Sequence, residues 1–259
     1  MFIQIRSKND TAASLRGQVV TRKRTVLRLG SSTPTDQIFP EGVRRGKEII
    51  EINTVEACHN SGNKITMKQM FDAVGVVSAE WAQMSNIHGY EGDPWEHYPA
   101  IIKHKNSSKG NGIFYIENEP ALAAFILEHN YNINDYIIEK FYNYVKEYRL
   151  HVTKDGCFYT CRKMLRDDAT ERWHRHDSNS VWILEENELF AKPANWDEIV
   201  AECVKAMTSV GLDISAIDIK VSNHNPARFI ILETNSAPAL AEITTVKYID
   251  KLKAIVDEF

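Results

Sequence analysis

The sequence of 259 residues has few cysteines and no excess of one charge. Its four cysteines, Cys58, Cys157, Cys161 and Cys203, include no Cys-x-x-Cys pair. This spacing disfavours a zinc cluster or a disulfide framework and favours packed thiols. The 31 basic and 35 acidic residues give a formal net charge of −4. A broad electrostatic attraction to nucleic acid is therefore not expected, and we predict no nucleic-acid partner.

Long apolar runs are absent as well. No stretch reaches the roughly 18 residues that cross a bilayer, and the first residues lack the apolar core of a signal peptide. We therefore expect a cytoplasmic protein without a membrane partner. The length allows one large or two small domains, each with its own core.

Two β-like apolar runs near the C-terminus, Ile217–Val221 and Phe229–Thr234, are separated by the turn residues Asn223–Pro226. The pattern predicts an antiparallel hairpin. With the turn centred between His224 and Asn225, Asp218 would lie opposite Ile231, and Glu233 opposite Ala216.

In that hairpin, Asp218, Glu233 and Asn235 share one face because side chains alternate with a period of two. Two carboxylates and an amide oxygen suit a metal that prefers oxygen and is shared with phosphates. We therefore predict a magnesium site. For the hairpin alone, polar side chains turned to solvent are an equal alternative.

The segment Pro99–Ile116 predicts a strand, a flexible loop and a second strand. Its glycines permit positive φ and close approach to a ligand, and its serines and exposed N–H groups can donate to phosphate oxygens. No Gly-Lys-Ser/Thr opens a helix here, so a Walker-type loop is excluded. An ordinary hairpin is the alternative for this loop alone. The phosphate-binding candidates are Lys103, Ser107, Ser108, Gly110 and Gly112.

A third hairpin is predicted where Asp155-Gly156 separates two alternating apolar runs. In that register Arg149 pairs with Arg162, and Glu147, Arg149, His151 and Arg162 lie on one face. Stacked like charges are unfavourable without a partner, so we expect an anion there, such as a triphosphate, an acyl phosphate or a substrate carboxylate. The alternative is a solvated strand face with neighbouring acids.

In chain order, these segments resemble the ATP-grasp superfamily over about three quarters of the chain, and are most similar to its branch that ligates amino acids to proteins or peptides. In Ser61–Val77, Lys64 matches the helix lysine presented to ATP. Lys103 matches the second nucleotide lysine, and Ser107–Gly112 matches the phosphate-covering loop. Tyr136–Tyr142 resembles the hinge strand whose backbone faces adenine.

The resemblance implies a full set of site residues. Glu147 matches the carboxylate that holds the ribose hydroxyls. The implied nucleotide-binding residues are Lys64, Lys103, Ser107, Ser108, Gly110, Gly112, Glu139, Lys140, Phe141, Tyr142 and Glu147. The implied metal ligands are Asp218, Glu233 and Asn235. The family often has an arginine two residues before the metal aspartate, where this chain has Ala216. The catalytic candidates for stabilising phosphate are therefore Lys103, Arg149, Arg162 and Lys163.

The activity that the resemblance implies is ATP-dependent ligation of a carboxylate to an amine. An acyl phosphate forms first, and the amine then displaces phosphate, with ADP released. The expected cofactors are ATP and Mg²⁺, with Mn²⁺ as an alternative metal. The carboxylate and amine substrates would be of amino-acid or peptide kind. Two alternatives stay open: a small-molecule phosphotransferase on the same fold, and a non-catalytic ATP-binding regulatory module. The sequence does not indicate an oligomeric state.

The expected fold class is α/β (α+β), with two α/β lobes that clasp ATP. We predict a short N-terminal α/β unit over residues 1–60, a smaller nucleotide lobe over 61–140 and a larger lobe with the metal site over 141–259. Helical spacing predicts helices over 119–128 and 196–210. The charged segment 166–179 contains Trp173-His174-Arg175-His176. This is a weak metal signal, and in the peptide-ligating branch the matching stretch approaches the acceptor.

Overall fold

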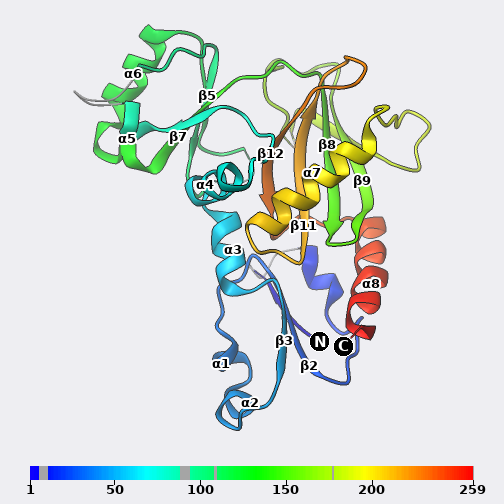
Figure 1. Ribbon diagram of the computed structural model, residues 1–259. Coiled ribbons are helices and arrows are strands. Elements are labelled where there is room, and N and C mark those ends of the chain that lie inside the picture. The colour runs from blue at the N-terminus through cyan, green and yellow to red at the C-terminus, as the bar shows by residue number, and fades with distance from the viewer. Residues whose placement is uncertain (6–10, 88–93, 108–109, 177, 259) are drawn as a thin grey trace.

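The computed structural model describes residues 1–5, 11–87, 94–107, 110–176 and 178–258. Within them, three sheets lie in three regions of the molecule (Figure 1). An N-terminal unit occupies the bottom of the view, and a smaller and a larger lobe lie above it on opposite sides. The mixed α/β architecture confirms the predicted fold class.

The N-terminal unit is built on a parallel sheet of β1 (Phe2–Ile5), β2 (Arg24–Leu29) and β3 (Ile49–Ile52), in that order. The 3-10 helix η1 (Thr11–Leu15) and the short helices α1 (Thr35–Ile38) and α2 (Pro40–Arg44) complete it. The C-terminal helix α8 (Glu242–Asp257) packs against this unit, and its Tyr248 and Leu252 are fully buried with Leu27 and Leu29. A parallel sheet needs covered faces, and here a helix from the other end of the chain supplies part of the cover.

The smaller lobe holds an antiparallel sheet in the order β4-β7-β5-β6. Its elements are β4 (Trp81–Gln83), α5 (Met84–Ile87), β5 (Ala100–His104), β6 (Ile113–Ile116), α6 (Glu119–His129), η2 (Asn130–Asp135) and β7 (Tyr136–Lys140). The predicted strand, loop and strand over Pro99–Ile116 are confirmed as β5 and β6, and α6 confirms the first predicted helix. Two connecting helices, α3 (Val55–Gly62) and α4 (Lys64–Val74), lead from the N-terminal unit into this lobe.

The larger lobe is a five-stranded antiparallel sheet in the order β10-β9-β8-β11-β12. Its strands are β8 (Lys146–Thr153), β9 (Gly156–Leu165), β10 (Ser180–Leu184), β11 (Ile214–Val221) and β12 (Phe229–Asn235). Helix α7 (Trp196–Ser209) confirms the second predicted helix and covers one face of the sheet (Figure 1). Alternate residues of β8 and β11, such as Leu150 and Ile217, pack with Ile199 and Met207 of α7. The residues between them, including Glu147, Arg149 and Asp218, lie on the opposite face, called the charged face below.

The predicted register of the hairpin β8–β9 is wrong. Its turn residues are Lys154 and Asp155, and Thr153 pairs with Gly156. Phe158 is then an extra residue in β9, because Val152 pairs with Cys157 and His151 with Tyr159. The ring of Phe158 packs on Tyr248 of α8, 5.2 Å between centroids. This long-range contact accompanies the bulge, and local turn signals do not contain it.

Candidate active site

Two carboxylates and an amide meet where β11 pairs with β12. Asp218 lies directly opposite Glu233, and Asn235 Nδ2 donates a hydrogen bond to Asp218 Oδ2 at 3.2 Å. Because Nδ2 points to Asp218, the amide oxygen of Asn235 is turned elsewhere and can accept a further partner. The three predicted metal ligands therefore form one contiguous group.

A β-bulge produces this arrangement, and the predicted pairing of Asp218 with Ile231 is wrong. Ile231 pairs with Ile219, and Leu232 is the extra residue before Glu233. Without the bulge Leu232 would face Asp218, and Glu233 would point to the α7 side. The bulge turns Glu233 back to the side of Asp218, so the predicted common face is correct although the predicted register is not.

Arg149 binds the same aspartate from the neighbouring strand β8. Its Nε donates to Asp218 Oδ1 at 2.7 Å and its Nη2 to Oδ2 at 2.8 Å, a bidentate pair. The guanidinium carbon also lies 4.9 Å from the ring centroid of Trp182. Burial alone would raise the pKa of Asp218, but the Arg149 guanidinium outweighs it and the pKa lies below its usual value. Asp218 is therefore ionised at neutral pH, as its predicted role as a metal ligand requires.

Lys163 takes the position that the sequence predicted for Arg162. In the observed register Arg162 pairs with Tyr148, whose ring packs on the α7 side, so Arg162 and Arg149 do not share a face. Lys163 pairs with Glu147 on the charged face, and its Nζ lies 5.2 Å from the ring centroid of Trp182. Two cations, Lys163 and Arg149, thus flank one indole beside Asp218.

Lys64 contacts both a predicted metal ligand, Glu233, and the predicted phosphate-covering loop at Ser107. It is the first residue of α4, where the Asn63 side chain caps the helix by accepting the backbone N–H groups of Ile65 and Thr66. Lys64 Nζ donates to Ser107 O at 2.5 Å and lies 4.0 Å from Glu233 Oε2. The structure therefore brings this predicted ATP lysine beside a predicted metal ligand 169 residues away in sequence.

Lys103 and Glu139 form a buried cluster with Lys68, a residue that the sequence reasoning missed. Lys103 Nζ donates to Glu139 Oε2, and Lys68 Nζ lies 2.9 Å from Glu139 Oε1. Burial opposes ionisation of Glu139, yet the two lysines hold its pKa at about 2. Burial lowers the pKa of Lys68. Two cations share one carboxylate, so the cluster favours a further anion. Lys68 lies four residues after Lys64 on the same helix face, and this spacing could have identified it from the sequence.

Glu147, the predicted ribose carboxylate, lies opposite two cations. It pairs with Lys220 of the neighbouring strand β11 and with Lys163 of the neighbouring strand β9, and Arg175 Nη1 lies 3.6 Å from its Oε2. Burial, and then the charge of Asp218, raise the pKa of Glu147. Burial lowers the pKa of Lys220 to about 8. Lys220 was also missed, although it lies two residues after Asp218 on the same strand face.

The side chains at the end of the predicted hinge segment contact other side chains of the protein. Lys140 Nζ and the Tyr142 hydroxyl both donate to Glu80 Oε1, at 2.7 and 3.1 Å. The Phe141 ring lies 4.6 Å from Lys220 Nζ. Because these side chains are engaged elsewhere, the backbone of the segment is the part that is predicted to contact a nucleotide base. A pocket of about 340 Å³ opens at its end. Its lining includes Phe141, Tyr144, Arg162, Trp173, Arg175 and Lys220.

Gly110 of the predicted phosphate-covering loop lies against His174 and His176 of the segment Trp173–His176. Gly110 and Gly112 have φ of +78° and +64°. A Cβ on Gly110 would come within 2.8 Å of His174 Cε1, and one on Gly112 within 3.2 Å of His104 Cβ. Burial lowers the pKa of His174 to about 4, so its ring is neutral at pH 7. The glycines are therefore required by both backbone conformation and close packing. Ser108, predicted to bind phosphate, lies outside the described residues.

The charged face of the larger sheet contacts the smaller lobe through Lys220 with Phe141, and Lys64 links Glu233 to Ser107. This arrangement of three sheets is the predicted ATP-grasp fold, and solved ligase structures share it. Two solved structures of D-alanine–D-alanine ligase from Bacillus anthracis superimpose on the chain, each with 9% sequence identity. One covers 98% of this chain and 91% of its own, with a TM-score of 0.62. The other, in complex with ATP, covers 99% and 97%, with a TM-score of 0.63. The predicted fold is confirmed.

A relative found by sequence comparison is also named as a ligase. The chain is 26% identical over 162 residues to a probable alpha-L-glutamate ligase 2 from Hahella chejuensis (strain KCTC 2396). The match covers 61% of this chain and 49% of the relative, so the chain spans about half the length of that protein. No family model matches the chain.

Proposed function

We propose that the protein is an ATP-dependent carboxylate–amine ligase that forms an amide or peptide bond and releases ADP and phosphate. The observation that carries the proposal is the meeting of Asp218, Glu233 and Asn235 with Lys64 between the two lobes. It joins hard oxygen ligands to a cation that can bind phosphate. The names of the two ligases similar to this chain support the same class of reaction.

In the proposed reaction, one oxygen of the substrate carboxylate attacks the γ-phosphorus and the bond to the β-phosphate oxygen breaks. This gives an acyl phosphate and ADP. The amine then attacks the acyl carbon, phosphate leaves with the bonding pair, and the amine loses a proton. Lys64 and Lys103 would bind phosphate oxygens, and Arg149 and Lys163 would offset charge from the other side. Closure of the loop at Gly110 and Gly112 would exclude water from the acyl phosphate.

The donor set beside Arg149 fits Mg²⁺. Asp218 and Glu233 offer carboxylate oxygens and Asn235 an amide oxygen, which are the ligands this hard cation prefers. Among the described residues, no group of three or more His, Cys, Asp or Glu side chains could hold a metal ion. The metal would therefore share its coordination with phosphate oxygens, as Mg²⁺ commonly does, and would supply charge neutralisation there.

The nucleotide's remaining contacts follow from the same geometry. Glu147 would accept hydrogen bonds from the ribose hydroxyls. The Arg175 guanidinium, 3.6 Å from this carboxylate, would then have to share it with the ribose or move away. The backbone of Glu139–Tyr142 would face adenine. We infer an amino-acid or peptide substrate, because both relatives are named for ligation of amino acids.

The cytoplasmic location and the lack of a membrane partner stay predictions. The described residues contain no helix that is long and apolar enough to cross a membrane. The four cysteines are free thiols, which supports the proposed cytoplasmic location.

The test is to incubate the protein with ATP, Mg²⁺ and mixed amino acids or peptides, and to measure ADP and new amide masses by mass spectrometry. ADP together with an amide supports the ligase. ADP with a phosphorylated product and no amide would establish the phosphotransferase instead. Tight ATP binding without turnover of any substrate would establish a regulatory module.

A further inference from the structure

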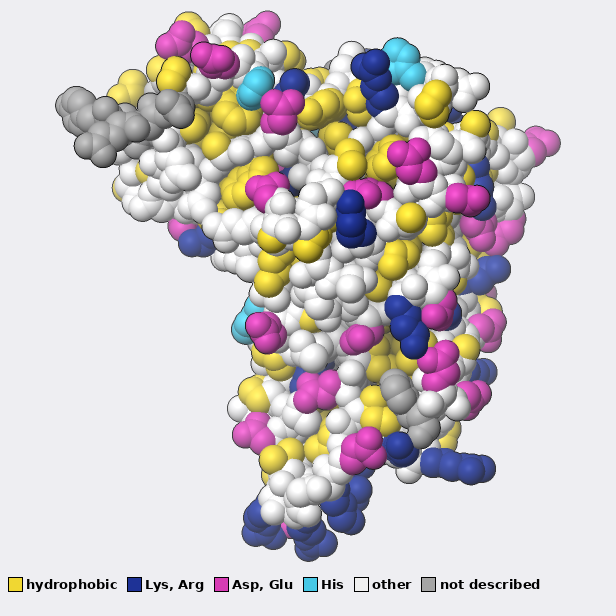
Figure 2. All heavy atoms as spheres, in the orientation of Figure 1, with side chains coloured by type: hydrophobic (Ala, Val, Ile, Leu, Met, Phe, Trp, Pro, Cys, Tyr) yellow, Lys and Arg dark blue, Asp and Glu magenta, His cyan; other side chains and the backbone are white. Residues whose placement is uncertain are grey.

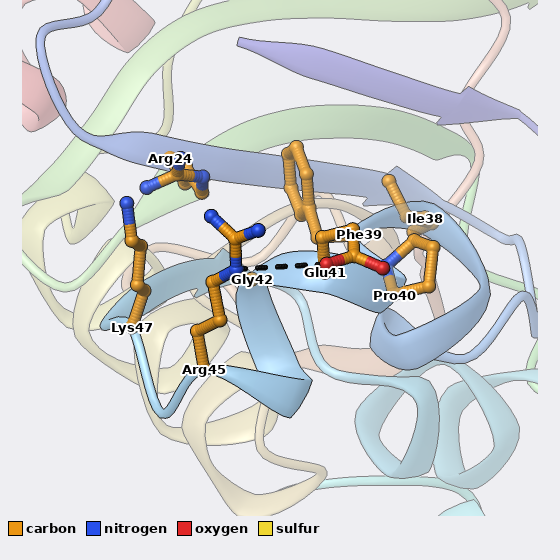
Figure 3. A pocket seen from close by; sticks show the side chains of 8 residues that line it. All are labelled: Arg24, Ile38, Phe39, Pro40, Glu41, Gly42, Arg45 and Lys47. Atoms are coloured by element: carbon orange, nitrogen blue, oxygen red, sulfur yellow. Dashed lines mark ion pairs between the residues drawn. The ribbon is translucent and has the colours of Figure 1, made fainter.

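A second pocket is lined by residues of the N-terminal unit (Figure 3). The helices α1 and α2 of this unit lie at the bottom of Figure 1, far from the strands β8 and β11 of the charged face. The pocket has a volume of about 240 Å³ and opens at the molecular surface between the start of β2 and the helices α1 and α2. Its walls include Arg24, Ile38, Phe39, Pro40, Arg45 and Lys47. None of these residues takes part in the proposed ligation.

Three cations converge on this pocket. Figure 3 shows the end groups of Arg24, Arg45 and Lys47 directed toward one another on one side, with Phe39 and Pro40 on the other. Arg24 and Lys47 form no ion pair within the described parts of the chain. The lining acid, Glu41, is engaged by Arg44 at 2.6 Å and by Arg45 at 3.6 Å. Converging cations repel one another, and an anion in the pocket would relieve this.

The positive charge is local. The segments 22–24 and 41–48 contain six cations and two acids, in a chain whose formal net charge is −4. Figure 2 shows the dark-blue side chains gathered at the lower tip of the molecule, where these segments lie, with magenta and dark blue mixed above it. Nucleic acid is bound by longer tracks of cations that follow a phosphate backbone. A small basic tip on an acidic protein fits a shorter anion better.

Apolar surface is the second feature of the pocket. Phe39 is half-buried and packs edge-on against Phe2, with 4.8 Å between ring centroids. Gly42 lines the pocket and is buried, and the Arg24 Cδ would lie 3.5 Å from a Cβ built on it. The stem of Arg24 thus lies over α2 and carries its guanidinium to the rim. A ligand that fills this pocket meets cations and hydrocarbon together.

We propose that this pocket binds an acidic polypeptide segment, with glutamate or aspartate carboxylates at Arg24, Arg45 and Lys47 and an apolar side chain against Phe39. The three cations are exposed, so each contact with a carboxylate is weak and several are needed at once. A polypeptide supplies several carboxylates and an apolar side chain in one ligand. This site is independent of ATP, and the proposal does not rest on the ligase activity.

The experiment measures fluorescence anisotropy of a labelled, glutamate-rich peptide with one central leucine, titrated with the full chain at low salt and without ATP. In the test variant, Arg24→Glu with Lys47→Glu, we expect binding to weaken by about tenfold, since two favourable pairs become repulsive. The matched control, Arg228→Glu with Lys253→Glu, changes the net charge equally at exposed positions outside the basic tip that do not line the pocket. It should bind as the unchanged protein does. Thermal unfolding checks that both variants fold.

Two comparison ligands test the chemistry of the occupant. A peptide with glutamine in place of glutamate should not bind, and one without the leucine should bind about threefold more weakly, because less apolar area is buried. The proposal is overturned if both charge variants lose binding equally, or if the unchanged protein does not bind the peptide. It is also overturned if single-stranded DNA of equal charge competes more strongly and depends on the same two residues.

Discussion

The two faces of the larger sheet carry different kinds of residue on the same strands. On the α7 side, Leu150, Ile217 and Ile219 are fully buried in an apolar core. On the charged face, Arg149 and Asp218 occupy the alternate positions of β8 and β11 and bind each other. The first face loses stability when altered, because packing density and apolar area are lost. The second face holds charges that are costly to bury, which is typical of a functional site.

The largest expected effect is on the charged face. Glu233→Gln removes one of the two anionic side chains proposed to bind Mg²⁺ and should lower Mg²⁺-dependent ADP formation by about a thousandfold, since several kcal/mol of charge stabilisation would be lost. The Glu233 side chain is 35% exposed, so the melting temperature should change little. A steady-state ADP assay with a thermal melt checks both. Unchanged turnover would remove Glu233 from the site.

Asp218→Asn should lower turnover to a similar extent and also reduce stability. Its carboxylate is the bidentate partner of Arg149, and breaking a buried ion pair from one side costs about 3–5 kcal/mol. Chemical denaturation of Asp218→Asn beside Glu233→Gln measures the difference. Equal stability of the two variants would mean that the Arg149 pair contributes little to folding.

The opposite face should show the reverse behaviour. Ile217→Ala leaves a cavity in the core between β11 and α7, and the free energy of unfolding should fall by about 2–5 kcal/mol. The turnover number of the folded fraction should be unchanged below the melting transition. A fall in turnover without a fall in stability would contradict the division between the two faces.

Glu147→Ala sharpens the comparison within the charged face. If Glu147 binds the ribose, its loss should raise the Michaelis constant for ATP by about tenfold and change the turnover number much less, because this contact is equal in ground and transition states. Steady-state kinetics at varied ATP measure both constants. A turnover defect with an unchanged Michaelis constant would exclude the ribose role.

The smallest expected effect on stability concerns the glycine loop. Gly110→Ala places a Cβ at φ +78° and against the His174 ring, whereas Gly112→Ala meets its nearest neighbour at 3.2 Å. Each should cost about 1–2 kcal/mol or less, mostly local to the loop. If this loop and the Trp173–His176 segment close together over the nucleotide, Gly110→Ala should lower the turnover number more than Gly112→Ala does. Hydrogen exchange with and without ATP and Mg²⁺ checks whether the loop becomes protected.

Local patterns predicted much of the fold. Helical periodicity indicated α6 and α7, and alternating apolar runs indicated β5, β6, β11 and β12. The predicted metal ligands lie together because Asp218 and Glu233 are close in sequence to one turn. Lys68 and Lys220 carried spacing signals, at four and two residues from predicted site residues, that could have been used.

The sequence by itself determined the element types and the chemical types of the side chains that we propose bind phosphate and metal, because periodicity and chemical type are local properties. Tertiary structure decided the two bulges, the exchange of Lys163 for Arg162 on the charged face, and the pairing of Arg149 with Asp218. Those features depend on contacts such as Phe158 with Tyr248, which join residues 90 positions apart. A bulge moves every later side chain to the other face of a strand, so the long-range packing that fixes it also fixes which charges meet.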